Sequence, residues 1–96
     1  GYIVKQNGQK VFEGQLSSLV KVLPNSVERV QYIQNSERDI TFLYIPDRTR
    51  FLSEHEEQLY RFLKTLLGSE MNVSLRAVDN IPREVSGKTL LVKQLM

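Results

Sequence analysis

Residues 27–45 read VERVQYIQNSERDITFLYI, and this stretch decides the fold. It contains two runs rich in β-branched and aromatic side chains, residues 27–34 and 40–45, separated by the polar segment 35–39. Such runs favour strands, and a short polar segment between them favours a reversal of the chain. The stretch therefore predicts two antiparallel strands in the middle of the chain.

A helix is predicted on each side of this strand pair. The first begins at Glu13 and has apolar residues at helical spacing until Pro24 forbids continuation, namely Leu16, Leu19, Val20 and Leu23. The second begins with Ser53 as the N-cap and Glu56 three residues later, the pattern of a capping box. Its apolar face extends to Gly68 and consists of Leu59, Phe62, Leu63, Leu66 and Leu67.

Further strands are predicted at both ends of the chain. Residues 2–5 and 10–12 flank Asn7-Gly8, a dipeptide that favours positive φ at both positions of a tight hairpin turn. Residues 73–78 and 89–93 are the last two predicted strands. The order of elements predicts an α+β fold: a ferredoxin-like βαββαβ sandwich with two helices on one face of a mostly antiparallel sheet and an N-terminal β-hairpin.

The composition limits the function classes. The chain has 96 residues, enough for one domain over residues 1–96, and its 13 basic and 11 acidic residues are too evenly balanced to indicate nucleic-acid binding. There is no cysteine, and His55 is the only histidine, so we expect no metal site. No apolar run approaches the roughly 20 residues of a spanning helix, so we expect no membrane segment and a cytoplasmic location.

Residues 81–88, IPREVSGK, form a segment that we call the lysine loop. Pro82 fixes one φ angle, Gly87 permits a backbone geometry closed to other residues, and an apolar strand is predicted to follow. These features could hold the Lys88 ammonium at a defined point, where it could neutralise an anion. From the spacing alone, a lysine exposed to water at the start of a strand remains the alternative.

The lysine loop resembles the C-terminal lysine motif of the adenylate-forming (AMP-binding) enzymes, the superfamily of acyl-CoA synthetases, luciferases and carrier-protein ligases. A second match lies at the other end of the chain, where residues 3–12, IVKQNGQKVF, look like the hairpin that follows the hinge in those enzymes. Within the superfamily, the chain is most similar to phenylacetate-CoA ligase and its CapK-like relatives of capsular-polysaccharide biosynthesis. The resemblance covers nearly the whole chain.

The resemblance implies a C-terminal lid that closes on an N-terminal adenylation domain, which lies outside this chain. That domain would bind the carboxylate substrate and ATP, and it would supply the main ligands of the Mg²⁺ ion. It implies that Lys88 is catalytic in adenylation and that Asn7, Gly8 and Gly87 contact cofactors. It also implies that the lid then rotates and presents the Asn7-Gly8 turn to CoA or a carrier thiol. The missing side chain of Gly8 would matter there, although a purely geometric need for glycine in the turn remains an alternative. We expect no activity from this chain alone.

Two other function classes remain open. A ferredoxin-like sheet also suits a regulatory domain that senses small molecules, because fold does not fix function. Phe42 and Tyr44 would share one sheet face with Ile40, which also suggests an RNA-stacking sheet, although a half-buried aromatic strand is the simpler interpretation. The polar loop at residues 47–50 is interpreted as a solvated connection.

Overall fold

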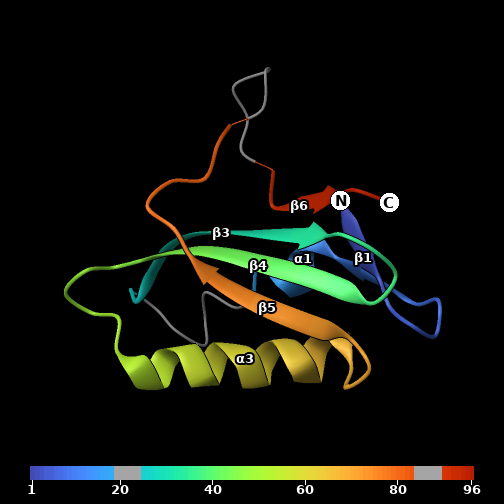
Figure 1. Cartoon of the computed structure of the whole chain (residues 1–96), viewed down its shortest axis with the longest axis horizontal. Helices are drawn as coiled ribbons and strands as arrows, with labels where there is room; N and C mark the ends of the chain where they lie inside the picture. The colour runs from blue at the N-terminus through green and yellow to red at the C-terminus, as the bar shows by residue number, and fades with distance from the viewer. Residues whose placement is uncertain (19–24, 84–89) are drawn as a thin grey trace.

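The longest pairing in the molecule joins β3 (Val27–Gln34) to β4 (Asp39–Pro46). It is antiparallel, with Tyr32 opposite Phe42 and Gln34 opposite Ile40, and a bulge interrupts it between Val27 and Arg29. The computed structural model describes residues 1–18, 25–83 and 90–96 (Figure 1). The strand pair predicted from residues 27–45 is confirmed.

Two further strands extend this pair into a four-stranded sheet with the order β5-β4-β3-β6. β5 (Asn72–Ala77) runs parallel to β4, and β6 (Val92–Gln94) runs parallel to β3. The long helix α3 (Ser53–Leu67) makes the crossover from β4 to β5, as parallel neighbours require. The antiparallel pairing is therefore central, and each edge strand is parallel to its neighbour.

A separate two-stranded sheet opens the chain. β1 (Tyr2–Val4) and β2 (Lys10–Phe12) are antiparallel, with Ile3 opposite Val11, and the short helix α1 (Glu13–Leu16) follows directly. Residues 19–24, which carry the rest of the predicted first helix, lie outside the described residues. The α+β class, the ferredoxin-like sandwich and the N-terminal hairpin are confirmed.

One face of the four-stranded sheet carries the hydrophobic core. Alternate residues of β3 and β4 point into it, and Leu16 of α1 and three leucines of α3 pack against them; the cluster consists of Ile3, Val11, Leu16, Tyr32, Ile40, Phe42, Tyr44, Leu59, Leu63, Leu67, Met71 and Val92. The Tyr32 hydroxyl donates a hydrogen bond to the Leu16 carbonyl at 3.1 Å, and burial raises the pKa of Tyr32 well above its usual range. This bond ties α1 to the same face that α3 covers.

Two predicted boundaries are wrong. Leu52, not Ser53, is the N-cap of α3, because Leu52 is extended and Ser53 is already helical. The ring of His55 supplies the capping bond, since its Nδ1 accepts the Leu52 N–H at 3.0 Å. The last strand begins at Val92 instead of Thr89, which itself lies outside the described residues. Local periodicity shows neither the histidine cap of α3 nor the late start of the last strand.

Candidate functional site

Lys88 and Gly87, the catalytic and cofactor-contacting residues expected in the lysine loop, lie outside the described residues, as do all of 84–89. The structure does describe how the loop is fastened on both sides. On the N-terminal side, the Val78 N–H donates to the Tyr44 carbonyl at 2.9 Å, and Ile81 is 1% exposed. Pro82 and Arg83, which follow it, are exposed. The chain therefore enters the lysine loop from a buried residue.

The C-terminal side of the loop is fastened to β3. The Gln31 side-chain amide donates to the Leu90 carbonyl at 3.0 Å, and the Tyr32 N–H donates to the Leu91 carbonyl at 2.8 Å. Gln31 is only 5% exposed although it lies on the sheet face opposite the core, because it alternates with Tyr32. A buried polar side chain needs a hydrogen-bond partner, and the backbone that follows the lysine loop provides it. Gln31 was not among the residues predicted for the site.

The turn of the opening hairpin carries Asn7 and Gly8, the other two predicted contacts. The Lys5 carbonyl accepts a hydrogen bond from the Gly8 N–H at 2.9 Å, and the Lys5 N–H donates to the Gln9 carbonyl at 2.7 Å. Gly8 has φ +85°, whereas Asn25 is the only described residue other than glycine with positive φ. The prediction of positive φ at both Asn7 and Gly8 is therefore wrong, because the loop is one residue longer than a two-residue turn and places only glycine in the left-handed region.

Asn7 holds the turn together through its side chain. Its Oδ1 accepts the Gln9 N–H at 2.9 Å, and its Nδ2 donates to Gln9 Oε1 at 3.1 Å. A Cβ added to Gly8 would meet no atom within 4 Å. Within this chain, then, Gly8 serves backbone geometry, and the open space beside it leaves room for a ligand or another domain.

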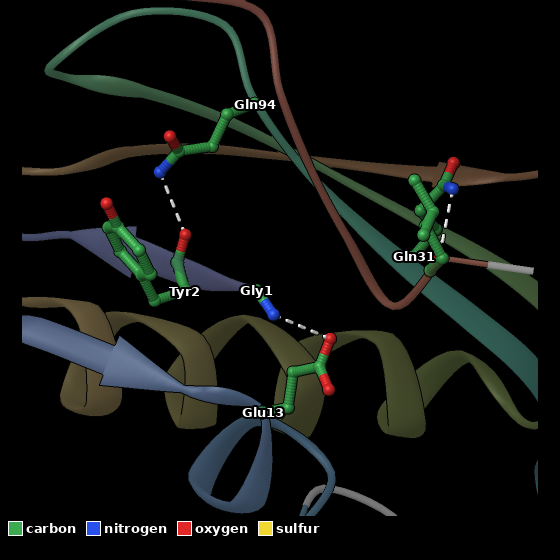
Figure 2. A network of polar contacts seen from close by, with 6 residues as sticks. Gly1, Tyr2, Glu13, Gln31 and Gln94 are labelled. Carbon is green, nitrogen blue, oxygen red and sulfur yellow. Dashed lines mark hydrogen bonds and ion pairs between the residues drawn. The ribbon is translucent and has the colours of Figure 1, made fainter.

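Two glutamines, the buried Gln34 and the exposed Gln94, fasten the hairpin to the sheet. The fully buried Gln34 side chain accepts from the Val4 N–H at 3.1 Å and donates to the Val4 carbonyl at 2.9 Å, so that it imitates a neighbouring strand. Gln94 donates to Gln34 Oε1 at 3.1 Å and to the Tyr2 carbonyl at 2.8 Å. Figure 2 shows Gln94 directed at the Tyr2 carbonyl, and the Gly1 amino group directed at Glu13. The polar residues at core-facing positions of β3 and β6 were the signal available in the sequence.

The hairpin turn and the start of the lysine loop are attached toward opposite ends of the β3–β4 ladder, and the chain returns from the loop beside Gln31 and Tyr32 in the middle of β3. The loop departs beside Tyr44, which pairs with Val30 near the beginning of β3. The hairpin is bonded to Gln34 at the end of β3, and Gln6 donates to the Glu37 carbonyl beyond it at 2.5 Å. Figure 1 shows the chain that follows β5 leaving the sheet on the side away from the turn between β1 and β2. The structure therefore brings Asn7 and Gly8 together and separates them from the attachment points of the loop.

An open groove of about 500 Å³ runs along the hairpin. Its lining combines cationic, amide and apolar side chains: Lys5, Gly8, Gln9, Lys10, Val11, Phe12, Gln15 and Leu66. Phe12 is 55% exposed, and the Lys10 ammonium lies 4.6 Å from the centre of the Tyr2 ring. Such a lining suits an extended ligand that has both polar and apolar parts and a negative charge.

The other candidate residues have structural explanations. Phe42 and Tyr44 are buried in the core, so their rings are not available for stacking on RNA bases. The Asp47 carboxylate accepts from Thr49 and from the Arg50 N–H at 3.1 Å, and these bonds, chiefly those from Thr49, lower the pKa of Asp47. His55 caps α3. In the described ranges, no group of three or more His, Cys, Asp or Glu residues could hold a metal ion, and no helix is long and apolar enough to cross a membrane.

The family model described as the CapK C-terminal domain matches residues 3–94, which includes the hairpin turn, both anchors of the lysine loop and the loop itself. No curated protein matches the chain.

Proposed function

This chain belongs to the CapK C-terminal domain family, and from that premise we propose that it is the lid of an AMP-forming acyl-CoA ligase-like enzyme. The enzyme would activate a carboxylate as an acyl-adenylate, with ATP and Mg²⁺ bound mainly by an N-terminal domain of the same protein. It would then transfer the acyl group to CoA or another thiol. Lys88 is the residue that the lid would deliver to the adenylation site.

The separation of the two attachment points is the observation that carries this proposal. A lid that serves two half-reactions needs two working ends, only one of which can face the active site at a time. The lysine loop starts at the Tyr44 end of the β3–β4 ladder and returns at Gln31 and Tyr32, whereas the hairpin turn is attached at the Gln34 end. A rotation of the whole domain would exchange one end for the other without refolding either.

The chemistry assigned to each end fits the residues there. Adenylation joins a carboxylate to a phosphate and releases pyrophosphate, so a cation delivered to those oxygens lowers the barrier. A lysine suits this step because its ammonium is a compact charge with three donors. At the hairpin end, the groove beside Lys5, Lys10 and Phe12 suits the polar and apolar stretches of a thiol-bearing arm.

The proposal is tested in the full-length parent protein with Lys88→Ala. We expect carboxylate-dependent pyrophosphate release to fall by about a hundredfold or more, because a charge-stabilising contact present in the transition state is lost. Arg48→Ala, at an exposed position of the turn after β4, also removes one positive charge and is the control. Unchanged pyrophosphate release in Lys88→Ala would refute the assignment.

A preformed acyl-adenylate separates the two half-reactions. Thioester formation from added acyl-adenylate and CoA should be nearly unaffected by Lys88→Ala, because that step would use the hairpin end. An equal loss in both half-reactions would instead indicate a general defect of the lid and would count against the two-ended mechanism.

A further inference from the structure

The outer edge of β5 is an unpaired strand edge. Asn72 donates its N–H to the Arg38 carbonyl at 2.7 Å and Val78 donates to the Tyr44 carbonyl at 2.9 Å, so even-numbered residues turn their backbone groups toward β4. Val73, Leu75 and Ala77 therefore direct their N–H and C=O groups away from the sheet. In residues 1–18, 25–83 and 90–96, none of these outward groups has a hydrogen-bond partner.

β5 also lacks the usual protection of an edge strand. Its sequence, NVSLRA, has no proline and a single charge, Arg76, and its register with β4 is unbroken over six residues. The opposite edge is different, since β6 has only three residues and Gln94 bonds it to β1. Of the two edges of the four-stranded sheet, β5 is the one open to another strand.

The flank of α3 beside β5 carries an exposed aromatic residue. Tyr60 is 43% exposed, and Lys64 lies one turn later on the same side of the helix. The Lys64 ammonium donates to the carbonyls of Ser69 and Met71, immediately before β5. Tyr60 therefore borders the same edge that β5 leaves open.

We propose that a second copy of this chain pairs antiparallel along β5, about a two-fold axis at Leu75, and continues the sheet across both copies. In this register, the two copies of Leu75 exchange backbone hydrogen bonds, and Val73 lies opposite Ala77 of the second copy. Arg76 lies opposite Ser74 of the second copy, so no like charges meet. A two-fold interface requires such self-complementarity, because the same patch supplies both sides.

The expected dimer is reversible. One six-residue strand pairing with a flanking tyrosine is smaller than the interface of a permanent dimer. The proposal does not depend on the function proposed above, because it requires neither substrate nor the N-terminal domain. The dimer and the proposed enzyme function can therefore be refuted independently of each other.

Sedimentation equilibrium of this 96-residue chain, from micromolar to millimolar concentrations, tests the dimer. Ser74→Glu should tighten it and Ser74→Lys should loosen it, each by about fivefold in Kd, because two symmetry-related pairs with Arg76 change at once. Ala77→Pro should abolish it, since the ring replaces an outward N–H that makes no bond within the sheet. Amide exchange at Val73, Leu75 and Ala77 should slow as the concentration rises.

The controls are Thr65→Glu and Thr65→Lys, which make the same charge changes at an exposed position of α3 and should leave the Kd unchanged. Denaturant unfolding of each variant establishes that it is folded. A chain that stays monomeric at millimolar concentration would overturn the proposal. So would a dimer that survives Ala77→Pro, or one that responds to both Ser74 substitutions in the same direction.

Discussion

The two ends of the β3–β4 ladder hold their functional segments in different ways. At the Gln34 end, the hairpin closes its own turn through Asn7 and Gly8, and buried side chains bind the backbone of its first strand. At the Tyr44 end, the described contacts of the lysine loop lie in the segments that flank it and in Ile81 at its start. The hairpin is thus bonded to the domain through its own residues, whereas the described bonds near the lysine loop belong to the segments on either side of it.

This difference suggests which substitutions alter each end. A change at a buried hairpin anchor should affect the stability of the whole domain, because the hairpin contributes Ile3 and Val11 to the core. A change at a loop anchor should act locally.

Gln34→Ala should have the largest effect on folding. It leaves the N–H and carbonyl of Val4 without their partner in a partly buried place, and we expect the free energy of unfolding to fall by about 2–3 kcal/mol. Denaturant unfolding measures this loss. Gln58→Ala, at an exposed position of α3, is the control and should change it by less than about 0.5 kcal/mol. Equal effects would contradict the role of Gln34 as an anchor.

Gly8→Ala should lower the free energy of unfolding by about 1 kcal/mol, less than Gln34→Ala does. Alanine is strained at φ +85°, although its Cβ would meet no atom within 4 Å. Gly8→Asn should cost less again, since asparagine tolerates the left-handed region. The measurement is again the free energy of unfolding. In the parent enzyme, Gly8→Asn should slow thioester formation but not pyrophosphate release, if a ligand passes close to the turn. Equal thioester rates would leave Gly8 with a geometric role only.

Gln31→Ala should lower the free energy of unfolding by about 1 kcal/mol, because it removes a single neutral hydrogen bond to the Leu90 carbonyl. Its effect should be local, so that amide exchange accelerates around residues 90–92 and stays unchanged in the hairpin. Gln31→Glu removes the donor but keeps the size of the side chain, and should behave in the same way. Faster exchange in residues 2–12 would show that the two ends are not independent.

The smallest effect concerns two carboxylates, one at each end. Hydrogen bonds lower the pKa of Asp39, first from Ser36 and then from Asn72, and those from Thr49 chiefly lower the pKa of Asp47. A lowered pKa in the folded state contributes stability above the unfolded value of about 3.9, and this stability is lost as the pH falls through the folded value. Asp39→Asn and Asp47→Asn should each flatten the decline of stability below about pH 4.

The Asp39 carboxylate joins two elements, because its partner Asn72 belongs to β5, whereas the described hydrogen bonds of the Asp47 carboxylate stay within its own turn. We therefore expect the larger flattening for Asp39→Asn. Unfolding free energies measured between pH 2 and pH 6 check this order, and two unchanged slopes would contradict both assignments.

Much of the fold was predictable because its signals are local. The apolar face that begins at Leu59 defined the long helix, and the β-branched runs defined β3 and β4. The cap of α3 was not predictable, because a histidine ring replaces the expected hydroxyl. Of the candidate site, Asn7 and Gly8 form the turn that the sequence placed there, although with a different backbone geometry. Gln31, Gln34 and Gln94 were missed: a polar residue at a core-facing position marks Gln34 and Gln94 as unusual, but it does not show which distant backbone each one binds.

Local sequence signals were enough to predict the β3–β4 pair, the long helix and the opening hairpin, and the predicted resemblance to the CapK family agrees with the family match over residues 3–94. Periodicity, turn residues and short motifs carry that information within a few neighbouring positions. Only the tertiary structure decided that the hairpin and the start of the lysine loop are attached toward opposite ends of one ladder, and that β5 leaves an open edge. The physical reason is that these relations depend on hydrogen bonds between distant segments, such as Gln34 with Val4 and Gln31 with Leu90, which form only when the sheet has assembled.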